Sequence, residues 1–361
     1  MEGDFIKIND WLLPLSWIYG AGVRLRNQMF EMGMLKSRSF DIPVISVGNI
    51  TVGGSGKTPH VEYLINLLRD KVKVAVLSRG YKRKSKGYML ATADTPMSDI
   101  GDEPYQMKKK FADIYVAVDK DRCHGIDQLT ANEETSDTDV ILLDDAYQHR
   151  YVKPGVNILL VDYHRLIMYD KLLPAGRLRE PQKGKARADI VIVSKCPAEL
   201  KPMEFRVITK AMNLFPYQKL YFTTLKYGSL RPIYGGEDRK LDTLTGDTSI
   251  LLLTGIASPQ QMIVDLKPYT ERITPLTFPD HHQYTDADID RINAEFEAMK
   301  GNDKMIVTTE KDNARLCGME GLSDEVKKNI YVLPVEVGFM LDQEEDFNEN
   351  IIGYVRKNSR N

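Results

Sequence analysis

The sequence is short of cysteine and lacks long hydrophobic runs. Its 361 residues include three cysteines without CxxC spacing, which predicts neither a disulfide framework nor a zinc site. No stretch reaches the roughly 18 consecutive apolar residues that span a bilayer. Basic and acidic residues nearly cancel, 49 against 51, so bulk charge gives no support for nucleic-acid binding. We expect a cytoplasmic protein, because the acidic N-terminal residues are unlike a secretory signal.

The composition is that of a globular chain with a sizeable core. Hydrophobic residues make up 42% and charged residues 28% of the chain, which excludes a disordered, collagen-like or disulfide-stapled protein. The length fits about two domains. We therefore look for two cores and for the boundary between them.

Short apolar runs recur over the first 200 residues, and most are separated by gaps long enough for a crossover helix. They show little alternation, as is typical of buried parallel strands. One such gap holds a predicted helix at His60 to Asp70. The sequence predicts a doubly wound α/β domain with a mostly parallel sheet. The expected strands are Ile42–Val47, Val72–Leu77, Ile114–Val118, Val140–Leu143, Val156–Val161 and Ile190–Val193.

A second, smaller α/β domain is expected after a change in character near residue 223. Tyr221–Leu225 and Leu230–Tyr234 read as a hairpin-like pair, followed by Gly235 and Gly236. We predict a first domain over residues 1–222, a linker over 223–248 and a second domain over 249–361. The elements expected in the second domain are strands at Ile250–Leu253, Ile273–Phe278, Met305–Thr308 and Ile330–Val335, a helix starting at Ser258-Pro259 and a helix over Asp286–Met299.

Both tryptophans lie in the uncharged run Trp11 to Val23, which basic residues follow. Apolar and aromatic side chains flanked by cations are typical of a helix in a membrane interface. A helix packed on the domain core, with its aromatics buried, explains the same residues. Both interpretations stay open from the sequence alone.

The strongest motif is a glycine-rich loop that follows the first expected strand and opens a helix. Glycines let backbone N–H groups surround phosphates, and the helix N-terminus adds positive potential. Lys57 would bridge the β- and γ-phosphates, and the Thr58 hydroxyl would ligate Mg²⁺. The alternative is a glycine-rich turn that happens to precede a lysine, which the strand–loop–helix context disfavours. The loop residues are Thr51, Val52, Gly53, Gly54, Ser55, Gly56, Lys57 and Thr58, with threonine where GxxxxGK[ST] opens with glycine.

Two carboxylates, Asp144 and Asp145, end the apolar run that begins at Val140. An acidic residue at the end of a buried strand is where a P-loop enzyme holds Mg²⁺. Acidic pairs also occur in ordinary turns, but the phosphate loop favours the metal interpretation. The chain lacks a guanine-reading Asn/Thr-Lys-x-Asp motif: Ser194-Lys195-Cys196-Pro197 lacks the acid. The nucleotide expected is therefore ATP.

Arginines gather in segments that should follow strands, where a parallel sheet binds its ligands. Arg79, Arg122, Arg177 and Arg179 could hold phosphates or an anionic substrate, although surface ion pairs explain each one taken singly. The segment 278–284 holds two adjacent histidines beside an acid. A catalytic or orienting histidine, a structural one and a metal ligand all remain open there.

Together these residues resemble the tetraacyldisaccharide 4′-kinase family, the lipid A 4′-kinases of Gram-negative bacteria. The resemblance covers nearly the whole chain, and the order and spacing of seven motifs carry it. One departure is Tyr147, where phenylalanine is more usual. The motifs are VGNITVGGSGKTP at 47–59, SRGY at 78–81, GDEP at 101–104, DDAYQHR at 144–150, LLPAGRLREP at 172–181, FPDHH at 278–282 and TEKD at 309–312.

The resemblance implies a P-loop NTPase type of fold and the transfer of the γ-phosphate of ATP, with Mg²⁺, to the 4′-hydroxyl of a tetraacylated glucosamine disaccharide 1-phosphate. It also implies a peripheral, monotopic protein on the cytoplasmic face of the inner membrane, which favours the interfacial interpretation of Trp11–Val23 within an N-terminal helix over about 5–34. No nucleic acid and no obligate protein partner are expected.

The resemblance also assigns roles to single residues. It implies that Asp102, paired with His281, is the catalytic base, with Asp145 as the competitor beside the metal ligand. Glu180 is expected to help Thr58 and Asp144 hold the metal. Further contacts with substrate or nucleotide are expected from Tyr81, Arg122, Asp145 and His149.

Three other classes of protein compete with a lipid kinase. A P-loop NTPase switch or metal-insertion chaperone would hydrolyse nucleotide without a lipid acceptor, but the chain shows no Cys/His metal cluster. A kinase of a soluble small molecule would not need the tryptophan-rich N-terminal run. A non-catalytic nucleotide-binding regulator would have no obvious use for the aspartate and histidine pairs.

Overall fold

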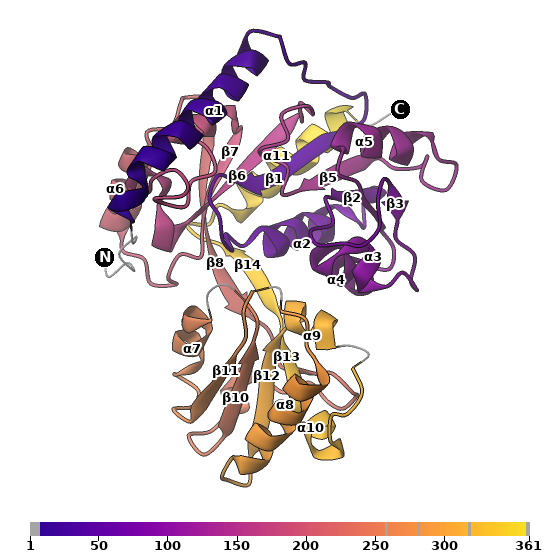
Figure 1. Ribbon diagram of the computed structural model, residues 1–361, viewed down its shortest axis with the longest axis vertical. Coiled ribbons are helices and arrows are strands. Elements are labelled where there is room, and N and C mark those ends of the chain that lie inside the picture. The colour runs from indigo at the N-terminus through magenta and orange to yellow at the C-terminus, as the bar shows by residue number, and fades with distance from the viewer. Residues whose placement is uncertain (1–7, 257–258, 281, 317–318, 359–361) are drawn as a thin grey trace. The chain divides into compact units, whose positions relative to one another are not determined.

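The computed structural model describes residues 8–256, 259–280, 282–316 and 319–358. The chain forms two compact units (Figure 1). Unit 1 contains the chain up to Leu225 and again from Val337 onward, and unit 2 contains Lys226–Glu336. Unit 2 is therefore inserted into the sequence of unit 1.

Within the described residues, unit 1 is built on a nine-stranded sheet in the order β14-β8-β7-β6-β1-β5-β2-β4-β3. The pairs from β8 through β4 are parallel, and the edge strand β3 runs antiparallel to β4. This confirms the expected doubly wound α/β class. The strands are β1 (Val44–Asn49), β2 (Val74–Ser78), β3 (Met89–Leu90), β4 (Tyr115–Val118), β5 (Val140–Asp144), β6 (Val156–Asp162), β7 (Ile190–Ser194), β8 (Lys219–Tyr227) and β14 (Val335–Phe339).

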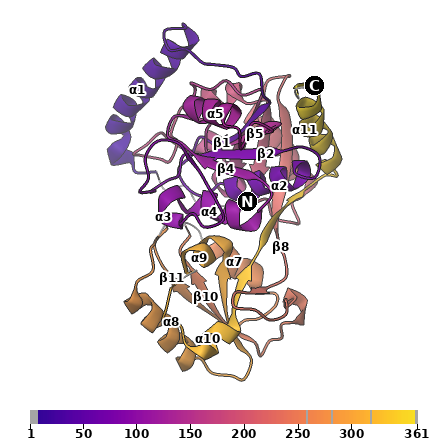
Figure 2. The ribbon, with the colours of Figure 1, turned by 90° about the vertical axis from the view of Figure 1, so that its right-hand side faces the viewer.

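Helices cover both faces of this sheet, because the strands are apolar on both sides. One face packs against α2, α4 and α11, and the other packs against α5 and α6. Figure 2 shows part of this arrangement, with α5 on one side of β1, β2 and β5 and with α2 and α4 on the other. The helices are α1 (Leu13–Glu31), α2 (Lys57–Leu68), α3 (Met97–Ile100), α4 (Asp102–Lys110), α5 (Arg122–Ala131), α6 (Pro202–Met212) and α11 (Glu344–Asn358).

The strand order reverses direction around β1, which places the ligand site. After β1 the chain continues through α2 to β2, which lies on the same side of β1 as β5. The next strand after β5 in the chain, β6, lies on the opposite side of β1. In open parallel sheets, ligands bind at the carboxyl ends of the strands next to such a switch point. The register sets Val47 of β1 beside Asp144 of β5. The glycine-rich loop and the two carboxylates therefore begin at the same edge.

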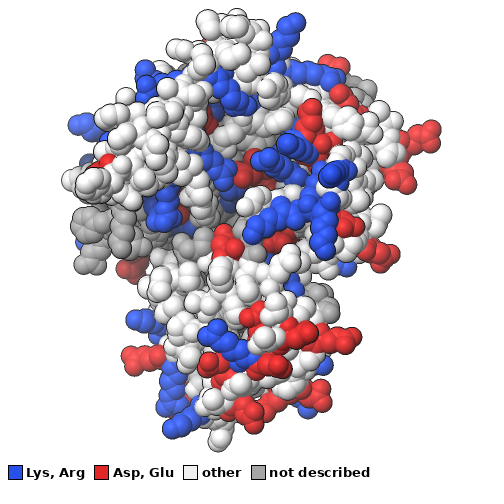
Figure 3. All heavy atoms as spheres, in the orientation of Figure 1, with Lys and Arg blue, Asp and Glu red and all other residues white. Residues whose placement is uncertain are grey.

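Helix α1 lies at the periphery of unit 1 in both views, away from the sheet (Figures 1 and 2). Trp11 is 93% exposed and Trp17 is 68% exposed, and Leu15 and Ile18 are exposed as well. The interpretation that these aromatics are buried in the domain core is therefore wrong. Figure 3 shows α1 as a mostly uncharged band with lysine and arginine side chains beside it. Among the described residues, no helix is long and apolar enough to cross a bilayer.

Unit 2 is a smaller α/β unit with a five-stranded sheet among its described residues, in the order β11-β10-β12-β13-β9. The pairs from β11 to β13 are parallel and β9 is antiparallel. The expected helix start at Ser258 lies outside the described residues. The elements are β9 (Arg231–Pro232), β10 (Ser249–Thr254), β11 (Ile273–Thr277), β12 (Lys304–Thr309), β13 (Ile330–Leu333), α7 (Gln260–Leu266), α8 (Asp286–Ala298), α9 (Glu310–Leu316) and α10 (Asp324–Asn329).

Two expectations about chain organisation are wrong. The hairpin-like pair at residues 221–234 does not form, because β8 joins the sheet of unit 1 beside β7 while β9 joins the sheet of unit 2. The final segment also does not belong to the second domain. Phe347, Ile351 and Val355 of α11 are buried in the core of unit 1, and β14 pairs with β8. The apolar face of α11 thus places the last 25 residues with unit 1.

Candidate active site

The glycine-rich loop connects β1 to α2, as the sequence predicts, and Lys57 and Thr58 are the first two residues of the helix. Gly56 precedes the helix with φ of +79°, a left-handed conformation that glycine adopts without strain. Below the loop, the Asn49 side-chain amide donates a hydrogen bond of 2.8 Å to Ser55 Oγ. This hydrogen bond stabilises the loop from within, and the N-terminus of α2 directly follows the loop.

The LLPAGRLREP motif runs alongside the start of this loop. The backbone N–H of Val52 donates to the carbonyl of Arg177 at 2.8 Å, and that of Arg179 donates to Ile50 at 2.7 Å. A further antiparallel bridge joins Thr51 and Leu178. The motif therefore supports the phosphate loop through its backbone.

Two carboxylates lie at the carboxyl end of β5, and one of them contacts the loop lysine. Asp144 is the last residue of the strand and is buried. Asp145 follows with φ of +47°, a conformation that non-glycine residues rarely adopt. Its Oδ1 lies 3.7 Å from Nζ of Lys57, and Arg179 Nη1 lies 3.3 Å away. The structure therefore brings together the phosphate-loop cation and the acidic pair.

The two carboxylates differ in their electrostatics. Burial, reinforced by Asp145 and Glu103, raises the pKa of Asp144 to about 7. Burial also favours the neutral form of Asp145, but the Lys57 and Arg179 cations outweigh it and hold the pKa of that carboxyl below its usual value. Asp145 is thus a stable anion, while Asp144 is a carboxylate that a cation would stabilise.

Arg122 and His149 lie in the same region. Arg122 is buried, and its guanidinium Nη2 donates to the main-chain oxygen of Asp144 at 3.3 Å. Burial lowers the pKa of Arg122 to about 10, which leaves it charged at neutral pH. Burial and the Arg122 charge lower the pKa of His149 to about 4, so its imidazole is neutral. Tyr81 is 54% exposed in the loop after β2.

Glu180 makes a buried ion pair that the sequence does not predict. Its carboxylate accepts from Arg187 Nη2 at 2.8–2.9 Å and from Gln148 Nε2 at 3.0 Å. The same Gln148 amide donates to the Asn49 carbonyl at 2.7 Å. Glu180 is therefore tied to the end of β1 through Gln148, and its assignment as a metal ligand stays a prediction.

The expected catalytic pair is only partly described. Asp102 is the first residue of α4 in unit 1, after Gly101 with φ of +91°. His281 lies outside the described residues. Its neighbour His282 donates a 2.9 Å hydrogen bond from Nε2 to the Asp288 carboxylate and stacks on Phe278. The pairing of Asp102 with His281 stays a prediction that rests on the family resemblance.

Sequence reasoning missed three side chains that contact the phosphate loop. Ser194 and Lys195 at the end of β7 bind loop carbonyls, and His60 of α2 does the same. The position of Ser194 and Lys195 after a parallel strand is a signal that could have found them. The sequence gives no comparable signal for His60, which reads as one more residue of an amphipathic helix.

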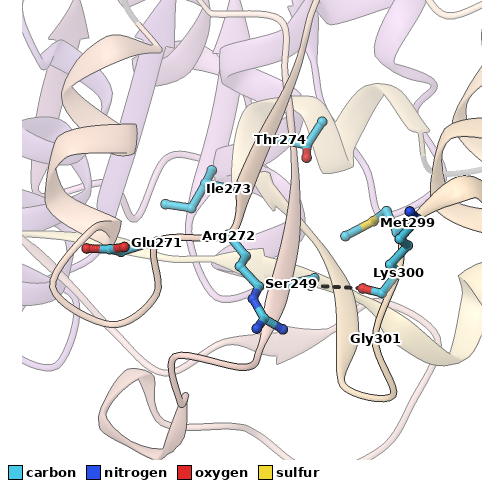
Figure 4. A pocket seen from close by; sticks show the side chains of 8 residues that line it. All are labelled: Ser249, Glu271, Arg272, Ile273, Thr274, Met299, Lys300 and Gly301. Carbon is cyan, nitrogen blue, oxygen red and sulfur yellow. Dashed lines mark hydrogen bonds between the residues drawn. The ribbon is translucent and has the colours of Figure 1, made fainter.

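A surface hollow of about 360 Å³ lies in unit 2 and is lined by residues of that unit. Figure 4 shows its lining side chains around the Ser249 hydroxyl, which donates to the Lys300 carbonyl at 3.1 Å. The lining includes the first residues of β10 and β11, at the amino ends of the parallel strands. Ligands of such sheets bind at the opposite, carboxyl ends.

A strand–loop–helix with a lysine at the helix start, facing a carboxylate pair at the end of the neighbouring strand, defines a P-loop nucleotide-binding protein. A sequence model of the family described as Tetraacyldisaccharide-1-P 4'-kinase matches residues 8–356. The chain is 60% identical to a Tetraacyldisaccharide 4'-kinase of Phocaeicola vulgatus, covering 100% of this chain and 99% of that one. It is 54% identical to the protein of that name in Bacteroides thetaiotaomicron, covering 100% and 97%.

A solved structure agrees with these matches. LpxK from Aquifex aeolicus, crystallised in complex with ATP, superposes with a TM-score of 0.72 at 32% identity, covering 95% of this chain and 98% of that one. The chain belongs to the tetraacyldisaccharide-1-P 4′-kinase family. It is a kinase, and the resemblance drawn from the seven motifs is confirmed.

Proposed function

We propose that the protein transfers the γ-phosphate of ATP to the 4′-hydroxyl of a tetraacylated glucosamine disaccharide 1-phosphate, at a membrane surface. The observation that carries the proposal is the approach of Lys57 Nζ to Asp145 Oδ1, at 3.7 Å, beside the buried Asp144. It joins a phosphate-binding cation to an acidic pair in one site. The names of the relatives and the ATP bound to the Aquifex structure support the same reaction.

Phosphoryl transfer needs positioning and charge neutralisation more than covalent chemistry. The loop amides and Lys57 would hold the β- and γ-phosphates. Arg179 contacts Asp145 at the same edge of the sheet, where its guanidinium would neutralise negative charge on the transferred phosphate. These groups lie on or beside the ends of β1 and β5, so the scaffold fixes them before the nucleotide binds.

A divalent cation fits the oxygen donors of this site. Thr58 offers a hydroxyl, and Asp144 offers a buried carboxylate. Burial raises the pKa of Asp144, and a bound cation would stabilise its ionised form. Glu180 is the third proposed ligand, and it would have to exchange its Arg187 partner for the metal. When bound, Mg²⁺ would neutralise phosphate charge and orient the terminal phosphates.

Asp102 is the proposed base for the attacking sugar hydroxyl. The electrostatics of its competitor support this choice, because Lys57 and Arg179 lower the pKa of Asp145 and so weaken it as a proton acceptor. Asp102 is the first residue of α4, at a loop of unit 1. His281 would orient it or share its proton.

Arg122, His149 and Tyr81 are proposed contacts for the anionic disaccharide or for the nucleotide. The buried Arg122 guanidinium carries charge at neutral pH, and the neutral His149 imidazole can both donate and accept a hydrogen bond. Such a set recognises a phosphorylated sugar by charge and by hydroxyl groups.

We also propose that α1 lies in the membrane interface on the cytoplasmic face of the inner membrane. Its tryptophans are exposed, and lysine and arginine side chains lie beside the helix (Figure 3), which supports this placement. The lipid substrate's acyl chains would then remain in the bilayer while its sugar reaches the site.

The test is transfer from γ-labelled ATP, with Mg²⁺, to tetraacyl disaccharide 1-phosphate in detergent micelles. Label at the 4′ position of the lipid is the expected result. Hydrolysis of ATP without labelled lipid would overturn the proposal in favour of an NTPase switch. Neither label nor hydrolysis would point to a different acceptor or to a non-catalytic nucleotide-binding role.

A further inference from the structure

Side chains from outside the phosphate loop bind three consecutive loop carbonyls. Each of the three donors comes from a different position: the last residue of β7, the residue after it, and the first turn of α2. The pairs are Lys195 Nζ to the Gly54 carbonyl, Ser194 Oγ to the Ser55 carbonyl at 2.9 Å, and His60 Nδ1 to the Gly56 carbonyl at 2.7 Å.

Fixing a carbonyl also fixes an amide. In a trans peptide unit the C=O of one residue and the N–H of the next are rigidly coupled and point in opposite directions. Holding the three carbonyls therefore orients the N–H groups of Ser55, Gly56 and Lys57. These are the amides that a phosphate loop presents to its ligand. Without such anchors, the peptide unit after Gly54 would rotate at little energetic cost, whereas the Gly56 carbonyl also accepts the backbone N–H of His60 at 3.3 Å.

The Lys195 anchor is itself held in place. Its ammonium lies 3.0 Å from Asp162 Oδ2 at the end of β6, so it is shared between that carboxylate and the Gly54 carbonyl. Lys195 has φ of +58°, which is unfavourable for a residue other than glycine. A lysine keeps this left-handed backbone conformation only where its contacts stabilise it. Here the contacts are those of its side chain with the Gly54 carbonyl and with Asp162.

The His60 anchor links the loop to a distant strand. His60 is 3% exposed, and a carbonyl cannot donate, so Nδ1 carries the proton that the Gly56 carbonyl accepts. Nε2 lies 3.0 Å from Thr223 Oγ1 on β8, whose hydroxyl donates to it in the neutral tautomer. The imidazole thus bridges the phosphate loop and a buried strand 163 residues away in sequence.

We propose that His60, Ser194 and Lys195 are positioning residues that hold the phosphate loop in its nucleotide-binding form before ATP arrives. The inference rests on the proposed ATP-dependent function and concerns the same site. The three side chains act through loop carbonyls, so their loss should weaken nucleotide binding while the lipid acceptor is bound as before.

His60 allows a matched pair of substitutions. In His60→Asn the side-chain amide nitrogen takes the place of Nδ1 and keeps the bond to Gly56, whereas in His60→Gln it reaches only to the place of Nε2 and Thr223. We expect His60→Asn to bind ATP as the native protein does, within about twofold, and His60→Gln to bind it about threefold to tenfold more weakly, the effect of one hydrogen bond. Ser194→Ala should resemble His60→Gln.

The measurements are the Kd of ATP by calorimetry on the full-length protein in micelles, and KM for ATP and for the lipid. The expected result is a rise in Kd and KM for ATP alone, with rescue by His60→Asn. Equal ATP affinity in His60→Gln, Ser194→Ala and the native protein would overturn the proposal. An equal loss in both His60 variants, accompanied by a rise in KM for the lipid, would also overturn it.

Two features keep the outcome interpretable. ATP binding is measured without the lipid acceptor. Native protein that binds ATP but labels no lipid would refute the proposed function, whereas the inference about the loop would still be decided by the ATP affinities of the variants. If a His60 variant fails to fold, Lys195→Met and Lys195→Arg carry the test, because Lys195 is partly exposed. Only Met removes the cationic donor, so unchanged ATP affinity in Lys195→Met would overturn the proposal.

Discussion

Replacing Asp144 with asparagine should stabilise the ligand-free protein while abolishing its metal-dependent activity. The pKa of Asp144 in the folded protein is about 7, against 3.8 for the ordinary group. The folded state therefore binds this proton more tightly than the unfolded state does. By linkage, the native protein loses stability as pH rises from about 4 to about 7, and the loss is complete above that range. An asparagine at this position carries no charge, so the variant does not lose stability in this pH range through that side chain.

The size of the effect follows from the shift. One pKa unit corresponds to about 1.4 kcal/mol, so a shift of about three units gives about 4 kcal/mol at pH 8 and about 2 kcal/mol at pH 5. Asparagine has nearly the same shape and can still accept the hydrogen bond from Ser78 Oγ, which lies 3.2 Å from Asp144 Oδ2.

The assay is calorimetric melting of the full-length protein without nucleotide or divalent cation, at pH 8 and pH 5. For a unit of this size, 4 kcal/mol corresponds to a rise of about 10 °C in the melting temperature. Asp145→Asn is the matched control with the opposite sign, because Lys57 and Arg179 lower the pKa of Asp145 and the charge stabilises the fold at pH 8. An Asp144→Asn protein no more stable than the native one at pH 8 would refute the electrostatic reasoning.

Three further outcomes are expected. Asp102→Asn should lower turnover at least about a hundredfold, the low end for a general base, while the Kd of ATP stays the same; a normal rate would remove Asp102 from that role. Changing Trp11 and Trp17 together to serine should reduce sedimentation of the protein with anionic vesicles, because the apolar surface proposed to enter the membrane interface is on α1. The control variant Met203→Ser, at an exposed position on α6, should sediment as the native protein does. Ile351→Ala should lower the unfolding free energy of unit 1 by about 3 kcal/mol in denaturant titration, since the side chain is fully buried; a change below 1 kcal/mol would contradict the placement of α11 in that core.

The sequence predicted the phosphate loop and six of the nine described strands of the first sheet, because these depend on local signals. Each buried parallel strand reads as an apolar run, and the run ending at Asp144 matches β5 to within one residue. The loop between β1 and α2 is a motif whose glycines and lysine have defined roles. Such features require no knowledge of which segments meet in space.

The features that the sequence did not predict depend on long-range contacts. The apolar face of α11 fits any core, and no local signal indicates that Ile351 packs on unit 1 rather than on unit 2, which directly precedes this segment in the sequence. The anchors His60 and Lys195 are found only when β7 and α2 are placed beside the loop. The exposure of Trp17 likewise depended on whether another element covers α1.

The insertion of unit 2 between β8 and β14 has a consequence for the order in which the protein is made. During translation, β8 emerges more than 100 residues before β14, its partner in the sheet. The ribosome releases nearly all of unit 2 while the β8 edge is still unpaired and the α2 face lacks α11. Unpaired strand edges are sites of aggregation. The β8 edge of the nascent first unit therefore stays unpaired until the segment that begins at Val335 emerges, whereas nearly all of the inserted unit has emerged before then.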